Sequence, residues 1–484
     1  MQTRSIKCPL RLAAEKWGDH PALIVDDDLI NWRSYDMLVS QVAGRLLSLG
    51  IKRGDRVAIL LENRVEYPPL LMALFRLGAV ACPLNIYLPE SGVALALSTV
   101  GSRFIIADSE GARHHGYGAA QTIALQRLYE LDERVTVPAT EIDLDQPATI
   151  IFTSGSSGRP KAALHTYGNH YYSALGSNEN IPFGPGDSWI LSLPLYHVGG
   201  LAILFRAQVG GGAVMIGIPD SAQGVMMRSR SFTHVSLVST LLYRWLGSGQ
   251  TPKQMAAGVK AVLMGGSAIP DSLLQQADSA GLPIFKSYGL TEMASQVTTT
   301  AVGDLPAKIK TSGKPLRYRQ VSIASDGEIL VKGETLFAGY VNGESIERPV
   351  DDDGWFHTGD LGQIDADGYL TVTGRKDNMF ISGGENIQPE EIEAALMQVA
   401  GVEGAVVVPV ADDEWGQRPV AFVMSSGGIK MDIDSLGDRL QSALPVYKIP
   451  TAFLFHPMEA QQGQLKVSRA RFAEMARKKL GGKE

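Results

Sequence analysis

The chain has 484 residues, of which 45% are hydrophobic and 20% are charged, and its formal net charge is −7. This composition excludes a mainly disordered or fibrous protein, and the length predicts at least two domains. The acidic balance argues against a nucleic-acid partner, because duplex binding depends on clustered cations that neutralise phosphates. We therefore expect a globular enzyme.

The cysteines and the apolar stretches bear on the compartment. Cys8 and Cys82 lie far apart and outside any C-x-x-C pattern, so we expect neither a disulfide framework nor a zinc site. Glu15 and Lys16 interrupt any apolar signal core near the N-terminus. Residues 67–85 are the best candidate for a membrane span, but three prolines and an arginine predict a core helix and a strand instead. A cytoplasmic protein without a membrane span is expected.

Short β-branched runs alternate with helical stretches from residue 22 to about residue 286. The first predicted strands are residues 56–61 and 79–83, and the first predicted helices are residues 66–78 and 91–100. The alternation recurs at residues 234–238, 239–246, 261–264, 271–279 and 284–286. This pattern is typical of α/β proteins with parallel sheets and helices on both faces.

The pattern changes between about residue 310 and residue 370, where short strands alternate with Gly/Asp turns. A β-rich subdomain is predicted there. The charged residues 374–378 then precede about a hundred residues, a suitable size for a small domain. Within that region, Pro389, Glu390 and Glu391 suit the first turn of a helix.

Residues 153–161 form a segment rich in glycine and hydroxyl groups that ends in a lysine. Because glycine lacks a Cβ atom, the backbone can turn tightly and bring successive N–H groups to an anion. Residues 148–152 predict a buried strand before the loop. The spacing differs from G-x-x-x-x-G-K-[ST], which disfavours a kinase or GTPase, and a flexible turn is the alternative. The candidate phosphate-binding residues are Thr153, Ser154, Gly155, Ser156, Ser157, Gly158 and Lys161.

A second motif, residues 288–292, supplies an aromatic face, a hydroxyl and a carboxylate after a predicted strand. Tyr288 is suited to stack on a base, Thr291 to donate to a phosphate, and Glu292 to hold Mg²⁺. Asp360 and Arg375 each adjoin a glycine, and a carboxylate is suited to bridge ribose hydroxyls. The alternative for both is a turn residue or a surface ion pair.

Five segments, residues 153–161, 288–292, 354–360, 374–386 and 463–466, together resemble the adenylate-forming superfamily of acyl-CoA synthetases, luciferases and peptide-synthetase adenylation domains. The segments occur in the family's order, and the resemblance covers essentially the whole chain. It implies a large N-terminal AMP-binding domain at residues 1–375, a hinge at 376–378 and a small mobile α+β domain at 379–484. It also implies that ATP, Mg²⁺ and CoA take part in the reaction.

The resemblance also implies residue roles. Tyr288 stacks on adenine, Asp360 with Arg375 holds the ribose, Thr291 contacts the α-phosphate and Glu292 binds Mg²⁺. Further nucleotide-binding residues are Gly266, Ser267 and Ala268, which line the base, and Gly289. The residues with implied catalytic roles are Lys466, Thr291 and His197.

Lys466 matches the superfamily's catalytic lysine, although its surroundings are looser than the common Ser-Gly-Lys version. An amine is suited to bridge the substrate carboxylate and the α-phosphate, two anions that must meet. An exposed surface lysine is the alternative.

Transfer to CoA needs a different geometry, which the superfamily provides by rotating the small domain. Asp377 matches the hinge position. Gly383 and Gly384 are assigned to the CoA step, where Gly384 leaves room for a narrow pantetheine tunnel. Trp415 adjoins CoA, with a packed aromatic turn as the alternative.

Arg206 lies in an otherwise apolar run and bears on the identity of the acid. A buried guanidinium demands an anion, and the alternatives are an internal carboxylate or solvent. By resemblance, Tyr196 and His197 lie around the acyl group, with Ser295 near Arg206. This stretch and residues 161–166, 181–184, 380–391 and 409–412 most resemble the ortho-succinylbenzoate:CoA ligases of menaquinone biosynthesis, whose substrate carries two carboxylates.

The expected partners are a small carboxylic acid, ATP and free CoA, since no carrier-protein module is present. Three alternatives stay open: a ligase for benzoates or medium-chain acids, a carrier-loading adenylation enzyme, and a nucleotide-binding sensor without catalysis. A luciferase-like oxidation would use similar motifs. The sensor would need neither Lys466 nor Glu292, and both are present. The sequence leaves open whether the protein forms a homo-oligomer.

Overall fold

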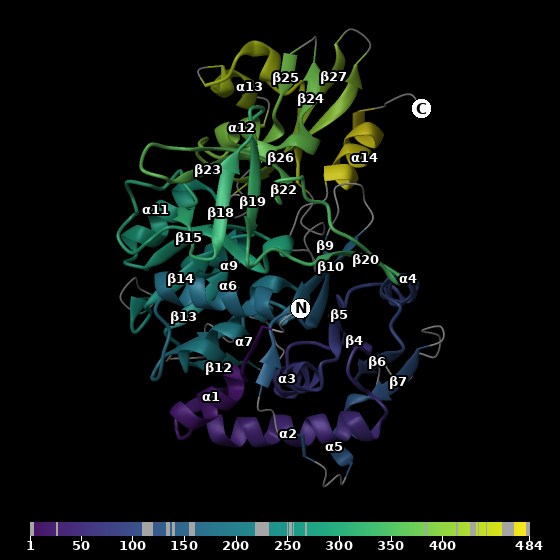
Figure 1. Ribbon diagram of the computed structural model, residues 1–484. Helices are drawn as coiled ribbons and strands as arrows, with labels where there is room; N and C mark the ends of the chain where they lie inside the picture. Colours follow the sequence, from purple (N-terminus) through teal and green to yellow (C-terminus); the bar gives the residue numbers. More distant parts are fainter. Residues whose placement is uncertain are drawn as a thin grey trace.

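The computed structural model describes most of the chain in a series of ranges. They are residues 4–25, 28–108, 120–131, 136–137, 141–153, 160–217, 232–248, 250, 254, 256–266, 269–382, 385–412, 415–425, 432–433, 435–441, 443–456 and 469–480. Two large mixed sheets form the body of the molecule, and the C-terminal residues lie together at one end of it (Figure 1).

The first large sheet has eight strands, parallel in its interior and antiparallel along one edge. β4 pairs with both β5 and β6, which confirms the strands predicted near residues 56–61 and 79–83. The spatial order is β21 (Ser345–Glu347), β20 (Gly339–Asn342), β10 (Lys161–Thr166), β9 (Pro147–Thr153), β5 (Val80–Pro83), β4 (Arg56–Leu60), β6 (Phe104–Ala107) and β7 (Gln121–Ala124).

The second large sheet has nine strands and is also parallel in its interior. Antiparallel strands close both of its edges. The spatial order is β17 (Lys314–Pro315), β16 (Ser295–Thr299), β15 (Ile284–Leu290), β14 (Ala261–Met264), β13 (His234–Leu237), β11 (Ser188–Ile190), β12 (Ala213–Ile216), β2 (Pro21–Val25) and β3 (Asp28–Asn31). A short pair, β1 (Ser5–Lys7) and β8 (Glu141–Asp143), stands apart.

Two helices begin where a side chain accepts a hydrogen bond from a free backbone N–H group. Asn31 accepts a hydrogen bond from the Ser34 N–H at the start of α2, and Thr166 and Asn169 form a capping box on α6. α3 is buried from Tyr67 to Phe75, which confirms that residues 67–85 form a core helix followed by a strand. The described α-helices before residue 300 are α1 (Pro9–Lys16), α2 (Trp32–Ser48), α3 (Tyr67–Leu77), α4 (Glu90–Val100), α5 (Leu125–Glu130), α6 (Tyr167–Asn180), α7 (Val198–Gly210), α9 (Ser239–Leu246) and α11 (Asp271–Ser279).

The predicted β-rich region forms a four-stranded antiparallel sheet. Its order is β18 (Arg319–Ile323), β19 (Glu328–Gly333), β22 (Phe356–Ile364) and β23 (Leu370–Arg375). A 3₁₀ turn, η3 (Lys376–Asn378), follows directly. Among the described residues, no helix is both long and apolar enough to cross a membrane.

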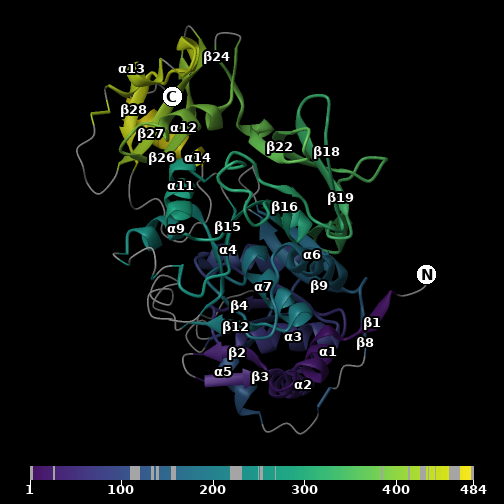
Figure 2. The same cartoon turned by 90° about the vertical axis from the view of Figure 1, so that its left-hand side faces the viewer.

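The residues beyond η3 build their own sheets and core, at the top of the view in Figure 2. The core includes Phe380, Ile392 and Val407. Its elements are β24 (Phe380–Ser382), β25 (Glu385–Ile387), α12 (Pro389–Leu396), β26 (Val402–Asp412), β27 (Gly416–Ser425), α13 (Leu436–Leu440), η5 (Val446–Lys448), β28 (Ala452–Phe455) and α14 (Arg469–Leu480). One contact to the body of the molecule is a hydrogen bond from the Tyr243 hydroxyl to the Glu403 carboxylate.

Candidate active site

The glycine- and serine-rich segment connects two antiparallel strands. Thr153 ends β9 and lies opposite Lys161, the first residue of β10. The sequence had predicted the strand before the loop but not the one after it. The Lys161 Nζ lies 4.8 Å from the centre of the Tyr340 ring on β20. The loop residues Ser154, Gly155, Ser156, Ser157 and Gly158 lie outside the described residues.

The motif at residues 288–292 extends the predicted strand instead of following it. β15 continues through Leu290 because it pairs with β16, and the 3₁₀ turn η2 (Thr291–Met293) comes next. A Cβ atom on Gly289 would lie 2.2 Å from the Ser295 carbonyl oxygen, so this close approach of two strands requires glycine. Gly266 follows β14 with φ 87°. Ser267 and Ala268 lie outside the described residues.

Two tyrosine hydroxyls orient the carboxylates of the candidate nucleotide site. The Tyr288 hydroxyl donates to Asp360 Oδ2 at 2.6 Å, and the Tyr340 hydroxyl donates to Glu292 Oε1 at 2.6 Å. Burial and the Asp360 charge raise the pKa of Tyr288, so this phenol stays protonated and donates. Tyr340 was not predicted, because nothing in the sequence of its strand marks it as a partner of Glu292.

Asp360 and Arg375 face each other across β22 and β23, and Arg375 Nη1 donates to Asp360 Oδ1 at 2.7 Å. Arg375 also contacts Asp377 Oδ2 in η3 at 3.3 Å. The Asp360 side chain is only 13% exposed and also holds the Tyr288 hydroxyl, so the pair is more than an isolated surface ion pair. The structure thus brings Tyr288, Asp360 and Arg375 together, as the sequence predicted.

Arg206 is buried in α7, with a side chain that no described carboxylate contacts. Its Nε donates to Ser177 Oγ at 2.9 Å, and its Nη2 donates to Gln296 Oε1 at 2.7 Å. Nη2 also lies 3.5 Å from Ser295 Oγ, which places Ser295 beside Arg206 as expected. The guanidinium lies 4.8 Å from the centre of the Trp189 ring.

One donor of this guanidinium has no partner. Within the described residues, Arg206 Nη1 is buried and makes no hydrogen bond. Burial lowers the pKa of Arg206 to about 9, which leaves the group charged at neutral pH. Both alternatives for Arg206, an internal ion pair and exposure to solvent, therefore disagree with the described structure. The arrangement is suited to receive an anion from outside the chain.

Gln296 and Ser177 hold Arg206 in place and were not predicted. The Ser177 hydroxyl donates to Gln296 Oε1 at 2.7 Å, and the Gln296 Nε2 donates to Thr299 Oγ1 at 2.7 Å. A second buried guanidinium, Arg319, donates to the Gln296 carbonyl at 2.7 Å. In the sequence, the only indication that these residues would hold Arg206 was a glutamine within a short run of β-branched residues.

Tyr196 and His197 lie at the N-terminal end of α7, with ring centres 4.7 Å apart. Burial raises the pKa of Tyr196 to about 12. Arg206 follows nine residues later, which corresponds to roughly 13 Å along the helix. The structure therefore places this pair at the start of α7 and Arg206 in its second half.

The residues assigned to the second half of the reaction are only partly described. Asp377 lies in η3, immediately after the sheet that carries Asp360 and Arg375. Trp415 is 39% exposed in a turn, with its N–H donating to Asp412. Lys466, Gly383 and Gly384 lie outside the described residues.

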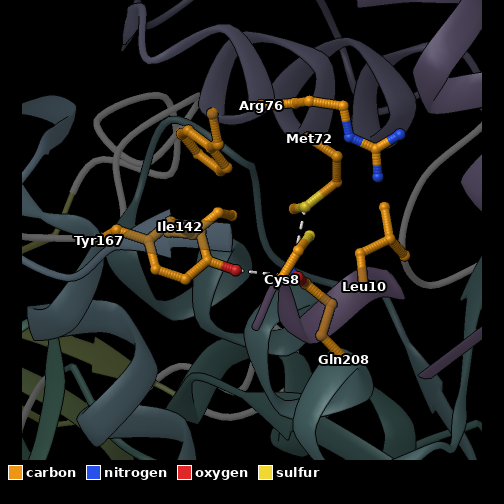
Figure 3. Close-up of a pocket in the computed structure, with 8 residues that line it drawn as sticks. Cys8, Leu10, Met72, Arg76, Ile142, Tyr167 and Gln208 are labelled. Carbon is orange, nitrogen blue, oxygen red and sulfur yellow. Dashed lines mark hydrogen bonds between the residues drawn. The ribbon is translucent and has the colours of Figure 1, made fainter. Parts of the chain in front are cut away.

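A small cavity lies elsewhere, between α1, α3, α6 and α7 (Figure 3). Its volume is about 10 Å³, enough for one water molecule at most. In Figure 3 the Tyr167 hydroxyl donates to Gln208, whose amide reaches the Met72 sulfur. This cavity is too small for a nucleotide.

Among the described residues, no group of three or more His, Cys, Asp or Glu side chains is placed to hold a metal ion.

Comparison with known families places the chain in a class. Residues 10–341 match the AMP-binding enzyme family, and residues 391–460 match the AMP-binding enzyme C-terminal domain. The chain belongs to the AMP-binding enzyme family, as the five sequence segments had indicated.

Two curated relatives are similar to almost the whole chain. The 2-succinylbenzoate–CoA ligase of Bacillus licheniformis is 34% identical over 92% of this chain and 95% of its own length. The enzyme of the same name from Geobacillus kaustophilus is 37% identical over 85% and 86%.

Solved structures of enzymes of this kind are also similar to almost the whole chain. The o-succinylbenzoate CoA synthetase of Bacillus subtilis in complex with its acyl-adenylate intermediate is similar at a TM-score of 0.87, with 31% identity over 97% of this chain and 98% of that one. Its complex with ATP and magnesium also gives 0.87, at 30% identity, over 96% and 99%. A double mutant bound to a product analogue gives 0.71, at 30% identity, over 97% and 99%.

Proposed function

We propose that this protein is an ATP-dependent acid–thiol ligase that joins 2-succinylbenzoate to CoA. The carboxylate attacks the α-phosphorus of ATP, pyrophosphate leaves, and the CoA thiolate then displaces AMP from the acyl-adenylate. The observation that carries the substrate assignment is Arg206, a buried cation with a spare donor and no described carboxylate partner. A substrate with two carboxylates has one to be activated and one to pair with this guanidinium.

The residues of the site are also suited to bind the nucleotide. Asp360 and Arg375 are suited to hold the ribose, and Tyr288 lies beside them with its hydroxyl fixed. Thr291 and Lys161 are suited to contact phosphates. Glu292 would hold Mg²⁺, which commonly binds through one or two carboxylates and the substrate phosphates, and which would neutralise phosphate charge.

Domain movement is part of the proposal, with residues 1–375 and 379–484 as the moving bodies and 376–378 as the hinge. Its support is the difference between two structures of the Bacillus subtilis enzyme. At nearly equal coverage, the acyl-adenylate complex is more similar to this chain than the complex with a product analogue. Within this proposal the described arrangement is the one used for adenylation, and rotation about Asp377 would bring residues 383–384 to the site for the CoA step.

Pyrophosphate release with a panel of carboxylic acids, with and without CoA, tests the function. We expect release with 2-succinylbenzoate, and turnover to AMP and a thioester only when CoA is present. Preference for benzoate or a medium-chain acid would retain the ligase class and reject the substrate. Adenylation without transfer to free CoA would favour a carrier-loading enzyme. The cytoplasm and menaquinone biosynthesis are the proposed setting.

A further inference from the structure

A buried column of three polar side chains lies behind the turn that carries Thr291 and Glu292. Thr149 on β9 and His165 on β10 are fully buried, and His170 on α6 is 2% exposed. The His170 Nε2 lies 2.8 Å from Thr149 Oγ1, which lies 3.4 Å from His165 Nδ1. His165 Nε2 then lies 2.7 Å from the main-chain carbonyl oxygen of Thr291.

The carbonyl group of Thr291, at one end of this column, determines which atoms carry the hydrogens. A carbonyl oxygen only accepts, so His165 Nε2 carries the hydrogen and donates to Thr291. In the neutral ring, Nδ1 is then an acceptor for the Thr149 hydroxyl, which in turn accepts from His170 Nε2. Burial lowers the pKa of His165 to about 4 and that of His170 well below its usual value, so both rings are neutral at physiological pH.

The turn itself adopts a strained backbone. Ala294 has φ 55° and Ser295 has φ 133°, a region that residues with a side chain rarely adopt. Such strain persists only where the surroundings hold the backbone, and it concentrates at functional sites.

Among the described residues, three hydrogen bonds from other elements reach main-chain carbonyl groups of this turn. His165 donates to the Thr291 carbonyl, the Phe337 N–H donates to the Glu292 carbonyl at 2.8 Å, and the Ser173 hydroxyl donates to the Ala294 carbonyl at 3.1 Å. Of these, the bond from His165 is made to Thr291, the residue proposed to contact the α-phosphate. It is also backed by a column whose last member, His170, stacks on Phe205 with ring centres 4.7 Å apart.

We propose that His165 is a positioning residue for adenylation: by donating from Nε2 to the Thr291 carbonyl, it fixes the turn that aims the Thr291 hydroxyl and the Glu292 carboxylate at the nucleotide. This inference rests on the nucleotide site proposed above. His165 does not touch the reacting atoms. Its contribution is therefore to the rate at which bound substrates react, rather than to how tightly the acid binds.

The test compares two substitutions in the full chain. In His165→Gln the amide places an N–H donor close to the position of Nε2, whereas His165→Leu has no donor. We expect His165→Leu to lower kcat for acid-dependent pyrophosphate release about 10- to 100-fold, since small misplacements in a reacting geometry cost up to about two orders of magnitude. KM for the acid should stay within about threefold, and His165→Gln should recover to within about fivefold of wild type.

A matched control separates positioning from stability. His234 on β13 is also buried, and its Nε2 lies 3.0 Å from the Pro182 carbonyl. His234→Leu loses a comparable bond away from the turn, so its kcat should stay within about threefold of wild type. Conversion of supplied acyl-adenylate to the thioester should also change by less than about threefold in His165→Leu.

Wild-type kcat in His165→Leu, equal damage in His165→Gln, or parallel loss of the thioester step would each overturn the proposal. If thermal unfolding shows that His165→Leu does not fold, Thr149→Val carries the test. It keeps the branched shape but removes the hydroxyl that holds His165 Nδ1, and a kcat loss of about 3- to 10-fold is expected. Unchanged kcat in that variant would also reject the role. The assays use whichever acid the wild type adenylates, so rejection of succinylbenzoate does not affect this result.

Discussion

The proposed site has a nucleotide end, around Asp360 and Glu292, and an acyl end, around Arg206. The charged groups at the two ends differ in whether they have partners of opposite charge or hydrogen-bond donors within the chain. At the nucleotide end, the carboxylates already have partners within the chain: Asp360 accepts from Arg375 and Tyr288, and Glu292 accepts from Tyr340. At the acyl end, Arg206 is buried and its described hydrogen-bond partners are all neutral, with Nη1 unused in the described structure.

The difference explains how one site combines a common cosubstrate with a selected acid. Paired groups at the nucleotide end are oriented before ATP arrives, so little reorganisation is needed on binding. An uncompensated buried cation favours ligands that bring an anion and penalises those that leave it unpaired. On the proposed assignment, selection of the acid depends on a charge that no described carboxylate neutralises.

The largest effect is expected in the step that joins the acid to the nucleotide. Lys466→Ala should slow adenylation by roughly 3–4 kcal/mol, about a hundredfold to a thousandfold, because the amine neutralises charge as carboxylate and α-phosphate come together. Thioester formation from supplied acyl-adenylate should be retained. Rapid-quench measurement of each half-reaction checks this, and equal loss of both would remove the lysine from the assigned role.

The acyl end should show the next largest effect. Arg206→Ala should weaken use of 2-succinylbenzoate by roughly 1.5–3 kcal/mol, about tenfold to 150-fold, the usual range for a hydrogen bond to a charged group. An analogue without the aromatic carboxylate should lose much less. We expect the enzyme and substrate deletions to be non-additive in kcat/KM, and additive losses would contradict the pairing.

Lowering the pH should reduce the stability of the fold through His165, the buried histidine behind the nucleotide end. Burial holds the pKa of His165 at about 4, below its ordinary 6.5, so the unfolded chain binds a proton first as the pH falls. The stability present above pH 6.5 should therefore be lost progressively down to about pH 4. Each such histidine contributes up to about 1.4 kcal/mol per pH unit, so urea unfolding of His165→Gln should show a shallower decline by up to that amount. An unchanged slope would contradict a neutral buried ring.

The smallest effect tests preorganisation at the nucleotide end. Tyr340→Phe removes the hydroxyl that donates to Glu292 and leaves the ring beside Lys161. We expect the Mg²⁺ concentration for half-maximal activity to rise about twofold to tenfold, equivalent to roughly 0.5–1.5 kcal/mol. The KM for the acid should not change, and a shift in that constant would show that the two ends are not separate.

The nucleotide end could be predicted because its chemistry lies in contiguous motifs. Residues 288–292, and Asp360 and Arg375 beside their glycines, carry recognisable groups at fixed positions. β22 and β23 bring Asp360 and Arg375 together, and the Tyr288 hydroxyl reaches Asp360 from β15. The sheets were predicted less completely. Their parallel interiors follow from alternating elements, whereas the antiparallel edge of the first sheet also needs β10 to pair with β20, a segment far away in the sequence.

Arg206 was visible as a cation in an apolar run, but the residues that hold it were not. Ser177 and Gln296 are 119 positions apart, and His165 and Thr291 are 126 apart. Each is an ordinary polar residue in its own element, and only the folded chain reveals its partner. The roles of all the site residues remain predictions, and for Lys466, Gly383, Gly384, Ser267, Ala268 and residues 154–159, which lie outside the described residues, so do their positions.

The stacking of Arg206 on Trp189 has a spectroscopic consequence. Trp189 is fully buried, and the guanidinium lies 4.8 Å from the centre of its ring. The emission of an indole responds to the electric field across it, and an anion that pairs with Arg206 alters that field. The difference in fluorescence between the wild type and Trp189→Phe therefore isolates an optical signal of acid binding that needs neither a label nor turnover.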